Sequence, residues 1–297
     1  MRTTLTGLVL ALALAGAAEA KSPAIPPSLP AAIFTDPPVD AAHPPRMEVL
    51  HIPSGGVEIN GVAYLAGGAG PHPTVVLLHG LPGNEKNLDL AQAIRRAGWN
   101  CVTFNYRGSW GSPGSFTFEG NLADAKAVLA FLRDPKTAGP LQIDPRKLVI
   151  GGHSMGGWVT ALTAAQDGGL AGAFLISAAD MGGRGATAGA KPAVVKSMAG
   201  NMESLAGTNA EKMADEVIAM SPRLSFNAAV AQGLATKPLL ILTSDDGLAP
   251  NAEKLAKAVQ ADGGKQVSLH HEATDHSWSG KRIALAALVI GWLQGLK

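Results

Sequence analysis

The chain of 297 residues has a formal net charge of +1, with 16% charged and 46% apolar residues. This balance is typical of a globular protein with one large α/β domain or two small ones. It excludes the basic face of a nucleic-acid-binding protein and an acidic tail. Cys101 is the only cysteine, which excludes an internal disulfide, and its apolar surroundings place it in the core. No spacing of His and Cys indicates a metal site, so we expect neither a metal nor a cofactor.

The first twenty residues have the features of a secretory signal peptide. Arg2 precedes an apolar stretch, and Ala18-Glu19-Ala20 offers a cleavage site between small residues. The stretch is too short for a comfortable membrane span. We therefore expect export and cleavage after Ala20, to the periplasm or the medium, with no membrane span in the mature protein. An uncleaved membrane anchor is the alternative.

Residues 21–46 contain eight of the twenty prolines of the chain and are expected to form a tail or linker on the surface. From Met47 onward, short apolar strands alternate with helical patterns. Residues 47–52 and 57–66 are expected to form a hairpin. Further strands are expected at 74–79, 101–106, 147–152, 171–178, 238–244 and 266–271, and helices at 85–98, 120–134, 154–166, 251–261 and 279–296. This alternation predicts one α/β domain over 47–297, a mostly parallel twisted sheet with helices on both faces.

One segment interrupts the alternation. Residues 181–237 lie between consecutive strands and are rich in Gly, Ala and Met. A connection of more than fifty residues is too long for an ordinary loop, so we expect a cap inserted into the domain. A crossover helix with long irregular flanks is the alternative.

The sequence Gly152-His153-Ser154-Met155-Gly156 fits the G-x-S-x-G pattern of a nucleophile elbow. Ser154 directly follows a predicted strand and begins a predicted helix, which is the setting that the motif requires. Glycines on both sides permit a tight, strained turn. We therefore expect Ser154 to be a nucleophile.

A serine nucleophile needs a base and a group that orients the base. His276 is the candidate base because it follows the last predicted strand, whereas His270 and His271 are expected inside that strand. The candidate acid is Asp246, after the strand at 238–244. Asp245 and Asp180 are alternatives. Asp275 is expected to shape the loop that carries His276, and His153 to be a packing residue in the elbow.

The amides of Leu81 and Met155 are the expected oxyanion hole, since Met155 follows the nucleophile and Leu81 lies in the loop after residues 74–79. His79 is expected to hold this loop by a hydrogen bond. Three aromatic residues after the strand at 101–106 either line a substrate pocket or belong to the core: Trp110, Phe116 and Phe118.

Over about residues 47–297 the sequence resembles the α/β-hydrolase superfamily. The resemblance rests on "LLHGLPG", "NYRGSWGSPGSF", "GGHSMGG", "TSDDGLAP" and "TDHSW", in this order. The region from "HGLPG" to "NYRGSWGSPGSF" is similar to bacterial serine hydrolases related to the prolyl-oligopeptidase family and to small feruloyl-type esterases. The resemblance implies a triad of Ser154, Asp246 and His276, with Leu81 and Met155 as oxyanion amides.

We therefore expect an exported serine hydrolase that cleaves carboxylic esters of small molecules. In contrast to prolyl oligopeptidases, no β-propeller precedes the hydrolase region, and the inserted segment has no obvious glutamate pair for a peptide amino terminus. The alternatives are an aminopeptidase or amidase with the same triad, and a non-catalytic binding protein on the same fold. The sequence carries no signal for an oligomeric state.

Overall fold

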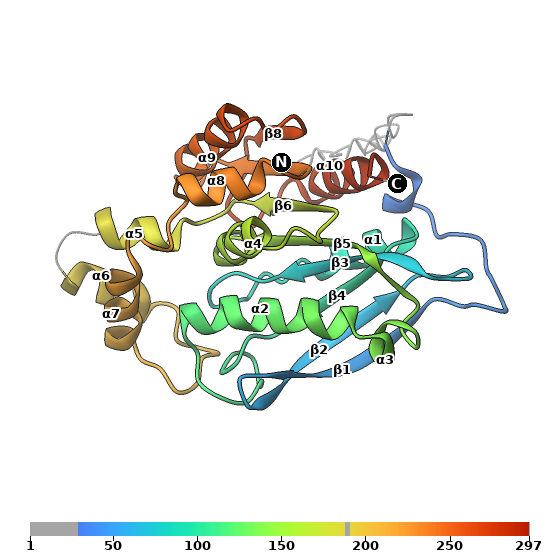
Figure 1. The fold of residues 1–297 in the computed structure, drawn as a ribbon, viewed down its shortest axis with the longest axis horizontal. Coiled ribbons are helices and arrows are strands. Elements are labelled where there is room, and N and C mark those ends of the chain that lie inside the picture. The colour runs from blue at the N-terminus through green and yellow to red at the C-terminus, as the bar shows by residue number, and fades with distance from the viewer. Residues whose placement is uncertain (1–28, 188–190, 297) are drawn as a thin grey trace, which may run out of the picture.

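The computed structural model describes residues 29–187 and 191–296, which contain eight strands in one sheet (Figure 1). The strands are β1 (Arg46–Ser54), β2 (Val57–Leu65), β3 (His72–Leu78), β4 (Asn100–Phe104), β5 (Ile143–His153), β6 (Gly172–Ile176), β7 (Leu239–Ser244) and β8 (Val267–Glu272). Their order in the sheet is β1-β2-β4-β3-β5-β6-β7-β8. The pairs β1–β2 and β2–β4 are antiparallel, and the other pairs are parallel. The prediction of a mostly parallel sheet is confirmed.

The inner strands are short and apolar because both faces of the sheet are covered. Every residue of β6 and β7 is buried, and so is β3 from Thr74 onward. The edge strand β1 instead alternates between buried and exposed residues from Leu50 to Ser54. This is the pattern of a strand with one face toward solvent. The burial of these four strands therefore follows their sequence patterns.

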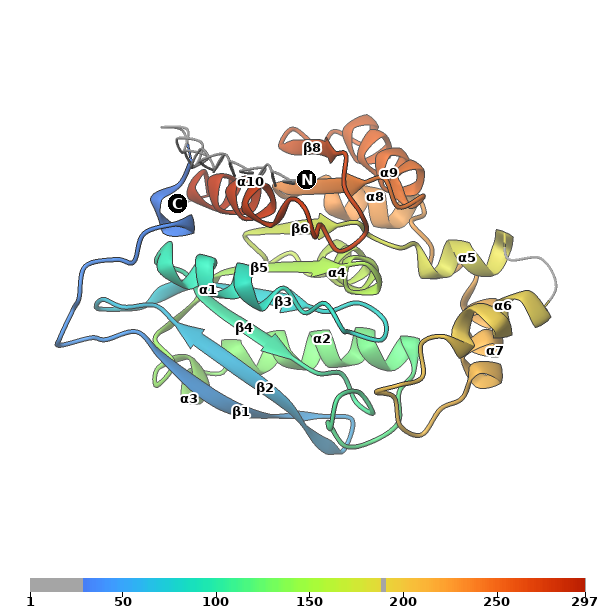
Figure 2. The same cartoon turned by 180° about the vertical axis from the view of Figure 1, so that it is seen from behind.

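Helices cover both faces of the sheet, as Figures 1 and 2 show from opposite sides. One face is covered by α1 (Leu88–Arg96) and α10 (Arg282–Gln294). The other face is covered by α2 (Phe118–Arg133), α4 (Met155–Gln166), α8 (Ala228–Leu234) and α9 (Ala249–Ala261). The short helix α3 (Pro135–Ala138) follows α2, and the 3-10 turn η1 (Ala31–Ile33) lies against α1 and α10. The prediction of helices on both faces is confirmed.

The segment between β6 and β7 contains three helices that stand to one side of the sheet: α5 (Met181–Thr187), α6 (Lys191–Ala199) and α7 (Ala210–Met220) (Figure 1). α7 packs against both α5 and α6. The next helix, α8, packs against α4 and α9, in the layer that covers the sheet. We call residues 181–227, the part of the predicted cap (residues 181–237) that precedes α8, the cap segment.

The strand order brings three loops together. β5 ends at His153, β7 at Ser244 and β8 at Glu272, and these strands run parallel. Parallel strands have their carboxyl ends at the same edge of a sheet, which is where open α/β sheets bind ligands. The loops that carry Ser154, Asp246 and His276 therefore begin at the same edge.

The predicted signal peptide, residues 1–20, lies outside the described residues. In the described part of the chain, no helix has the length and apolar character needed to cross a bilayer. Residues 29–187 and 191–296 also contain no cluster of three or more His, Cys, Asp or Glu side chains that could hold a metal ion.

Candidate active site

A cavity of about 330 Å³ lies at the carboxyl edge of the sheet. All five residues that the sequence predicts for the site line it: Leu81, Ser154, Met155, Asp246 and His276. The remaining wall is formed by Ala179, Met181, Arg184, Asn201 and Leu248. The structure therefore brings together residues that are as far as 195 positions apart in the sequence.

Ser154 occupies the turn between β5 and α4 in a backbone conformation that is unusual for a residue with a side chain. Its φ is 58° and its ψ is −121°. Two hydrogen bonds hold the turn: the N–H of Ser154 donates to the carbonyl of Ile176 at 2.9 Å, and the N–H of Ala179 donates to the carbonyl of Ser154 at 3.0 Å. Strain of this kind persists only where the surroundings enforce it, and it is frequent at active sites.

Three glycines without side chains allow the backbone segments around the turn to pack closely. A Cβ at Gly152 would lie 2.3 Å from the carbonyl oxygen of Gly156, and a Cβ at Gly156 would lie 2.4 Å from the carbonyl oxygen of Leu78. A Cβ at Gly80 would lie 2.9 Å from the Cβ of Ser154. The close packing of these backbone segments therefore excludes side chains at all three positions.

His276 and Asp246 form the central polar pair of the cavity. The Nδ1 of His276 lies 2.6 Å from the Oδ2 of Asp246, whose side chain is buried. The N–H of Leu248 donates to the other carboxylate oxygen at 2.8 Å. Burial raises the pKa of Asp246, but the hydrogen bonds from His276 and Leu248 outweigh burial and lower the pKa below its ordinary value. Asp246 is therefore ionised at neutral pH and accepts the Nδ1–H of His276.

The alternative residues from the sequence analysis have other partners. Asp245 points to an exposed position, where its Oδ1 lies 3.1 Å from the Nε2 of His271. Asp180 accepts the N–H of Gly183 at the start of α5. Asp275 accepts the N–H and the hydroxyl of Ser279 and so shapes the loop that carries His276.

Two buried histidines support the site. The Nε2 of His153 donates to the carbonyl of His276 at 2.8 Å, and the two rings lie 4.5 Å apart. The Nδ1 of His79 donates to the carbonyl of Gly80 at 2.8 Å. Burial lowers the pKa of both His153 and His79 to about 4. Both rings are therefore neutral at neutral pH and act through hydrogen bonds and packing.

Neither Leu81 nor Met155 donates its backbone N–H to another atom in the described part of the chain. Met155 is the first residue of α4, where a helix leaves its amides without intrahelical partners. Both residues line the cavity beside Ser154.

In the described residues no hydrogen bond joins Ser154 Oγ to His276. Such bonds are often long in a free enzyme and shorten when substrate binds.

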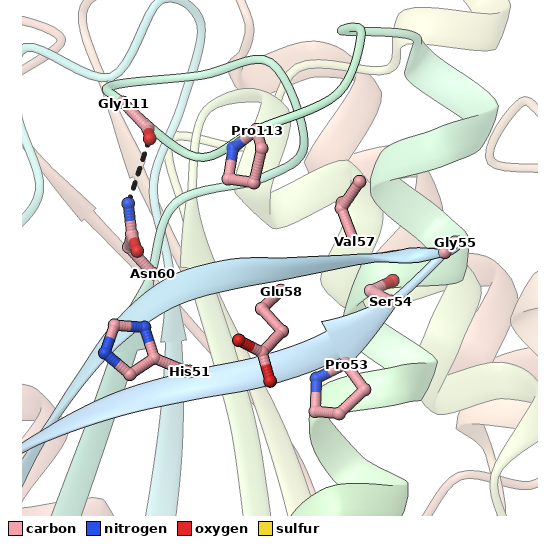
Figure 3. Close-up of a pocket in the computed structure, with 10 residues that line it drawn as sticks. His51, Pro53, Ser54, Gly55, Val57, Glu58, Asn60, Gly111 and Pro113 are labelled. Carbon is pink, nitrogen blue, oxygen red and sulfur yellow. Dashed lines mark hydrogen bonds between the residues drawn. The ribbon is translucent and has the colours of Figure 1, made fainter.

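A second, larger cavity of about 720 Å³ is open to solvent beside the β1–β2 hairpin. Figure 3 shows His51, Ser54 and Glu58 in its wall. The hydroxyl of Ser54 donates to the buried carboxylate of Asp124 at 2.5 Å, and in the described residues no hydrogen bond joins it to a histidine. In the smaller cavity a serine, a histidine and an aspartate hydrogen-bonded to that histidine lie together.

The sequence did not predict the part of the cavity wall that comes from the cap segment. Arg184 and Asn201 come from the cap segment, and no motif in that segment identified them. The aromatic residues divide as follows: Phe116 and Phe118 are buried in the core, whereas 38% of Trp110 is exposed. None of the three lines the 330 Å³ cavity. For Phe116 and Phe118 the core interpretation is correct.

Residues 75–287, well over half of the chain, match the alpha/beta hydrolase family. The chain belongs to this family. An uncharacterized protein of Mycobacterium tuberculosis (strain H37Rv) is 32% identical over 104 residues, which are 35% of this chain and 34% of that protein. The lysophosphatidylserine lipase ABHD12 of Danio rerio is 32% identical over 88 residues, 29% of this chain and 21% of the lipase. The match thus spans about a third or less of the length of these relatives.

Solved structures of α/β hydrolases share the fold. The carboxylesterase EstE1 from a metagenomic library superposes with a TM-score of 0.63 at 20% identity, over 86% of this chain and 91% of the esterase. A puromycin-hydrolyzing peptidase of Mycobacterium tuberculosis superposes with a TM-score of 0.61 at 20% identity, over 88% of this chain and 40% of the peptidase. At these identities the likeness establishes the fold.

The depressed pKa of His153 predicts that stability depends on pH. The unfolded chain binds this proton at a pKa near 6.5 and the folded chain only near 4. Stability from the neutral ring is therefore present above pH 6.5 and is lost as the pH falls toward 4, by about 3 kcal/mol. We expect urea unfolding of a His153→Gln variant to have a smaller loss of free energy over this window than wild type. The exposed His51→Gln serves as the matched control. Equal losses in wild type and His153→Gln would contradict the assignment.

Proposed function

We propose that this α/β hydrolase is an exported serine hydrolase that cleaves carboxylic esters of small molecules. The observation that carries the proposal is the hydrogen bond of 2.6 Å between His276 and Asp246 in the cavity that Ser154 lines from a strained turn. Nucleophile, base and orienting acid come from three different loops, and their order along the chain is serine, acid, histidine. This order is typical of α/β hydrolases.

In the proposed reaction, Ser154 Oγ attacks the ester carbonyl carbon while His276 Nε2 takes the hydroxyl proton. The tetrahedral intermediate then collapses, and His276 returns the proton to the leaving alcohol. Water then attacks the acyl carbon while His276 takes one of its protons. The second tetrahedral intermediate collapses as His276 returns that proton to Ser154 Oγ, which releases the acid and restores the enzyme. Asp246 accepts the Nδ1–H of His276 throughout, which leaves Nε2 unprotonated in the resting state and stabilises the imidazolium during transfer.

The oxyanion of the intermediate would bind the amides of Leu81 and Met155. Both N–H groups lack partners in the described residues, so neither has to break a hydrogen bond within the protein before it binds the oxyanion. The N-terminus of α4, which begins at Met155, also favours negative charge at this position. Removal of one such donor costs about 3 kcal/mol of transition-state stabilisation in serine hydrolases.

The cavity supports a small substrate. Its volume of about 330 Å³ is near the lower end for ligand pockets. Arg184 and Asn201 add polar side chains to the wall, so polar substituents of a substrate would lie near them. The carboxylesterase and lipase names among the similar proteins support ester hydrolysis, and the peptidase among the structural neighbours keeps amides as the alternative substrates.

Export rests on the sequence alone. We propose that the leader is removed after Ala20, so that the mature protein begins at Lys21. The intact mass of the protein recovered outside the cytoplasm checks this, and a mass that includes Met1 would contradict it.

Loss of the nucleophile is the first test of the proposed reaction. We expect Ser154→Ala to lower kcat for p-nitrophenyl esters by about 10⁵-fold or more without unfolding the protein. The assay uses acetyl to decanoyl p-nitrophenyl esters, feruloyl esters and aminoacyl p-nitroanilides, with circular dichroism as the folding control. Retained turnover in the variant would refute the nucleophile, and faster turnover of anilides than esters would favour the amidase.

Asp246 and its neighbour Asp245 provide a test of the proposed acid and a matched control. We expect Asp246→Asn to lower kcat by about 10⁴-fold, because an amide no longer holds the required tautomer of His276. The adjacent Asp245→Asn alters only the exposed contact with His271 and is expected to change kcat less than twofold. The same p-nitrophenyl ester assay measures both variants. A larger loss in Asp245→Asn would reassign the acid.

A further inference from the structure

The loop at residues 79–83 carries the Leu81 amide, and three of its carbonyl groups accept hydrogen bonds from side chains. The hydroxyl of Tyr106 donates to the carbonyl of His79 at 3.4 Å, and the ring of His79 donates to that of Gly80. The carbonyl of Pro82 accepts the indole N–H of Trp110 at 2.7 Å. The hydroxyl of Ser204, in the cap segment, donates to the same Pro82 carbonyl at 3.3 Å.

These contacts determine where the Leu81 amide points. The carbonyl of Gly80 and the N–H of Leu81 belong to one planar trans peptide group and point in opposite directions. The hydrogen bond from His79 to the Gly80 carbonyl therefore fixes the direction of the Leu81 N–H. On the other side, the ring of Pro82 restricts the backbone and its carbonyl is held by Trp110. Leu81 is thus preceded by a peptide group that His79 holds, and the Pro82–Gly83 peptide group that follows Pro82 is held by Trp110.

The side chains of His79 and Trp110 both lie close to the backbone of Gly83. A Cβ at Gly83 would lie 2.4 Å from the Nδ1 of His79 and 2.9 Å from the Nε1 of Trp110. The φ of Gly83 is also +99°, a conformation that side chains disfavour. The His79 imidazole and the Trp110 indole thus both approach the backbone at Gly83, which leaves no space for a side chain there.

Trp110 is itself held from several sides. Its backbone N–H donates to the carbonyl of Ser204 at 3.0 Å, and its carbonyl accepts the amide of Asn105 at 3.2 Å. The ammonium of Lys86 lies 4.3 Å from the centre of the indole ring. A tryptophan held in this way donates its N–H in a fixed direction although the ring is partly exposed.

The cap segment is joined by backbone hydrogen bonds to the loop that carries Trp110. The N–H of Ala206 donates to the carbonyl of Gly108 at 2.8 Å, and the N–H of Phe116 donates to the carbonyl of Ala206 at 2.9 Å. Ser109 and Leu205 form an isolated antiparallel bridge. Residues 204–206 of the cap segment are therefore paired with the loop that carries Trp110.

We propose that the indole N–H of Trp110, assisted by Ser204, is a positioning group that holds the Leu81 amide in the orientation required for the oxyanion. The inference rests on the proposed serine hydrolase function. It makes the oxyanion hole depend on the cap segment, because Ser204 contacts both Trp110 and Pro82. Trp110 acts through the loop and touches neither the nucleophile nor the base.

The test uses Trp110→Phe, which keeps an aromatic ring near Lys86 and removes the N–H. We expect kcat for a p-nitrophenyl ester to fall about tenfold while KM changes less than twofold, because the oxyanion forms only in the transition state. The affinity of an alkyl boronic acid, which forms a tetrahedral adduct with the serine, should fall by the same factor. The pH dependence of kcat should not shift, since His276 and Asp246 are untouched.

Three further variants separate the possible causes. Ser204→Ala should lower kcat less than Trp110→Phe does, because its hydrogen bond to Pro82 is longer. Lys86→Met should lower kcat less than Trp110→Phe does, because the indole N–H stays in place when the cation–ring contact is removed. Trp292→Phe, on the distant helix α10, is the matched control for replacing a partly buried indole and should also leave kcat unchanged.

The outcomes distinguish this inference from the proposed function. If Ser154→Ala keeps its turnover, the proposed function fails and the inference fails with it. If Ser154→Ala is inactive but Trp110→Phe has wild-type kcat and boronate affinity, only the positioning role is overturned. A Trp110→Phe variant that raises KM as much as it lowers kcat would also overturn that role, because it would place Trp110 in substrate binding.

Discussion

The turn at Ser154 is the constraint on which the rest of the site depends. A residue with a side chain is held at φ 58° and ψ −121° only because β5, α4 and the loop after β3 pack against one another without intervening side chains. Gly80, Gly152 and Gly156 provide that packing, since a Cβ at any of them would approach a neighbouring residue to 2.9 Å or less. The result is a hydroxyl exposed at the carboxyl edge of the sheet, at the first turn of a helix. Every other group of the proposed site is useful only in relation to this hydroxyl.

The order of the strands in the sheet then determines which side chains lie near the Ser154 hydroxyl. β5, β6, β7 and β8 are consecutive in sequence and adjacent in the sheet, so the loops after β5, β7 and β8 meet at one edge. Asp246 is buried and ionised because two hydrogen-bond donors stabilise its charge, and it determines the tautomer of His276. His153 and His79 are neutral because they are buried, and they add hydrogen bonds without adding charge. His276, the proposed base, thus contacts a carboxylate, whereas His153 and His79 donate to backbone carbonyl groups.

Much of this architecture can be predicted from sequence because its signals are local. Short apolar runs separated by helical patterns predict the sheet, and Ser154 is recognisable from its glycines and from the strand before it. Their positions after strands make His276 and Asp246 candidates, but Asp245 and Asp180 also follow strands, and it is the structure that shows which aspartate contacts His276. The cap contribution is not predictable in this way. Arg184, Asn201 and Ser204 come from a segment with no motif, and their place at the site depends on tertiary packing. The role of Trp110 is hidden for the same reason, since its partner Pro82 is 28 residues away and the contact is between a side chain and a carbonyl.

The most direct test of the account is covalent labelling with a fluorophosphonate, which forms an oxygen–phosphorus bond to an activated serine and releases fluoride. Mass spectrometry of the purified protein should find one phosphonyl group, on the peptide that contains Ser154. Labelling should be absent from Ser154→Ala and slowed in Asp246→Asn, because the hydroxyl is activated only when His276 is correctly oriented. An unlabelled wild-type protein, or equal labelling of another serine in Ser154→Ala, would contradict the central claim that Ser154 is the nucleophile.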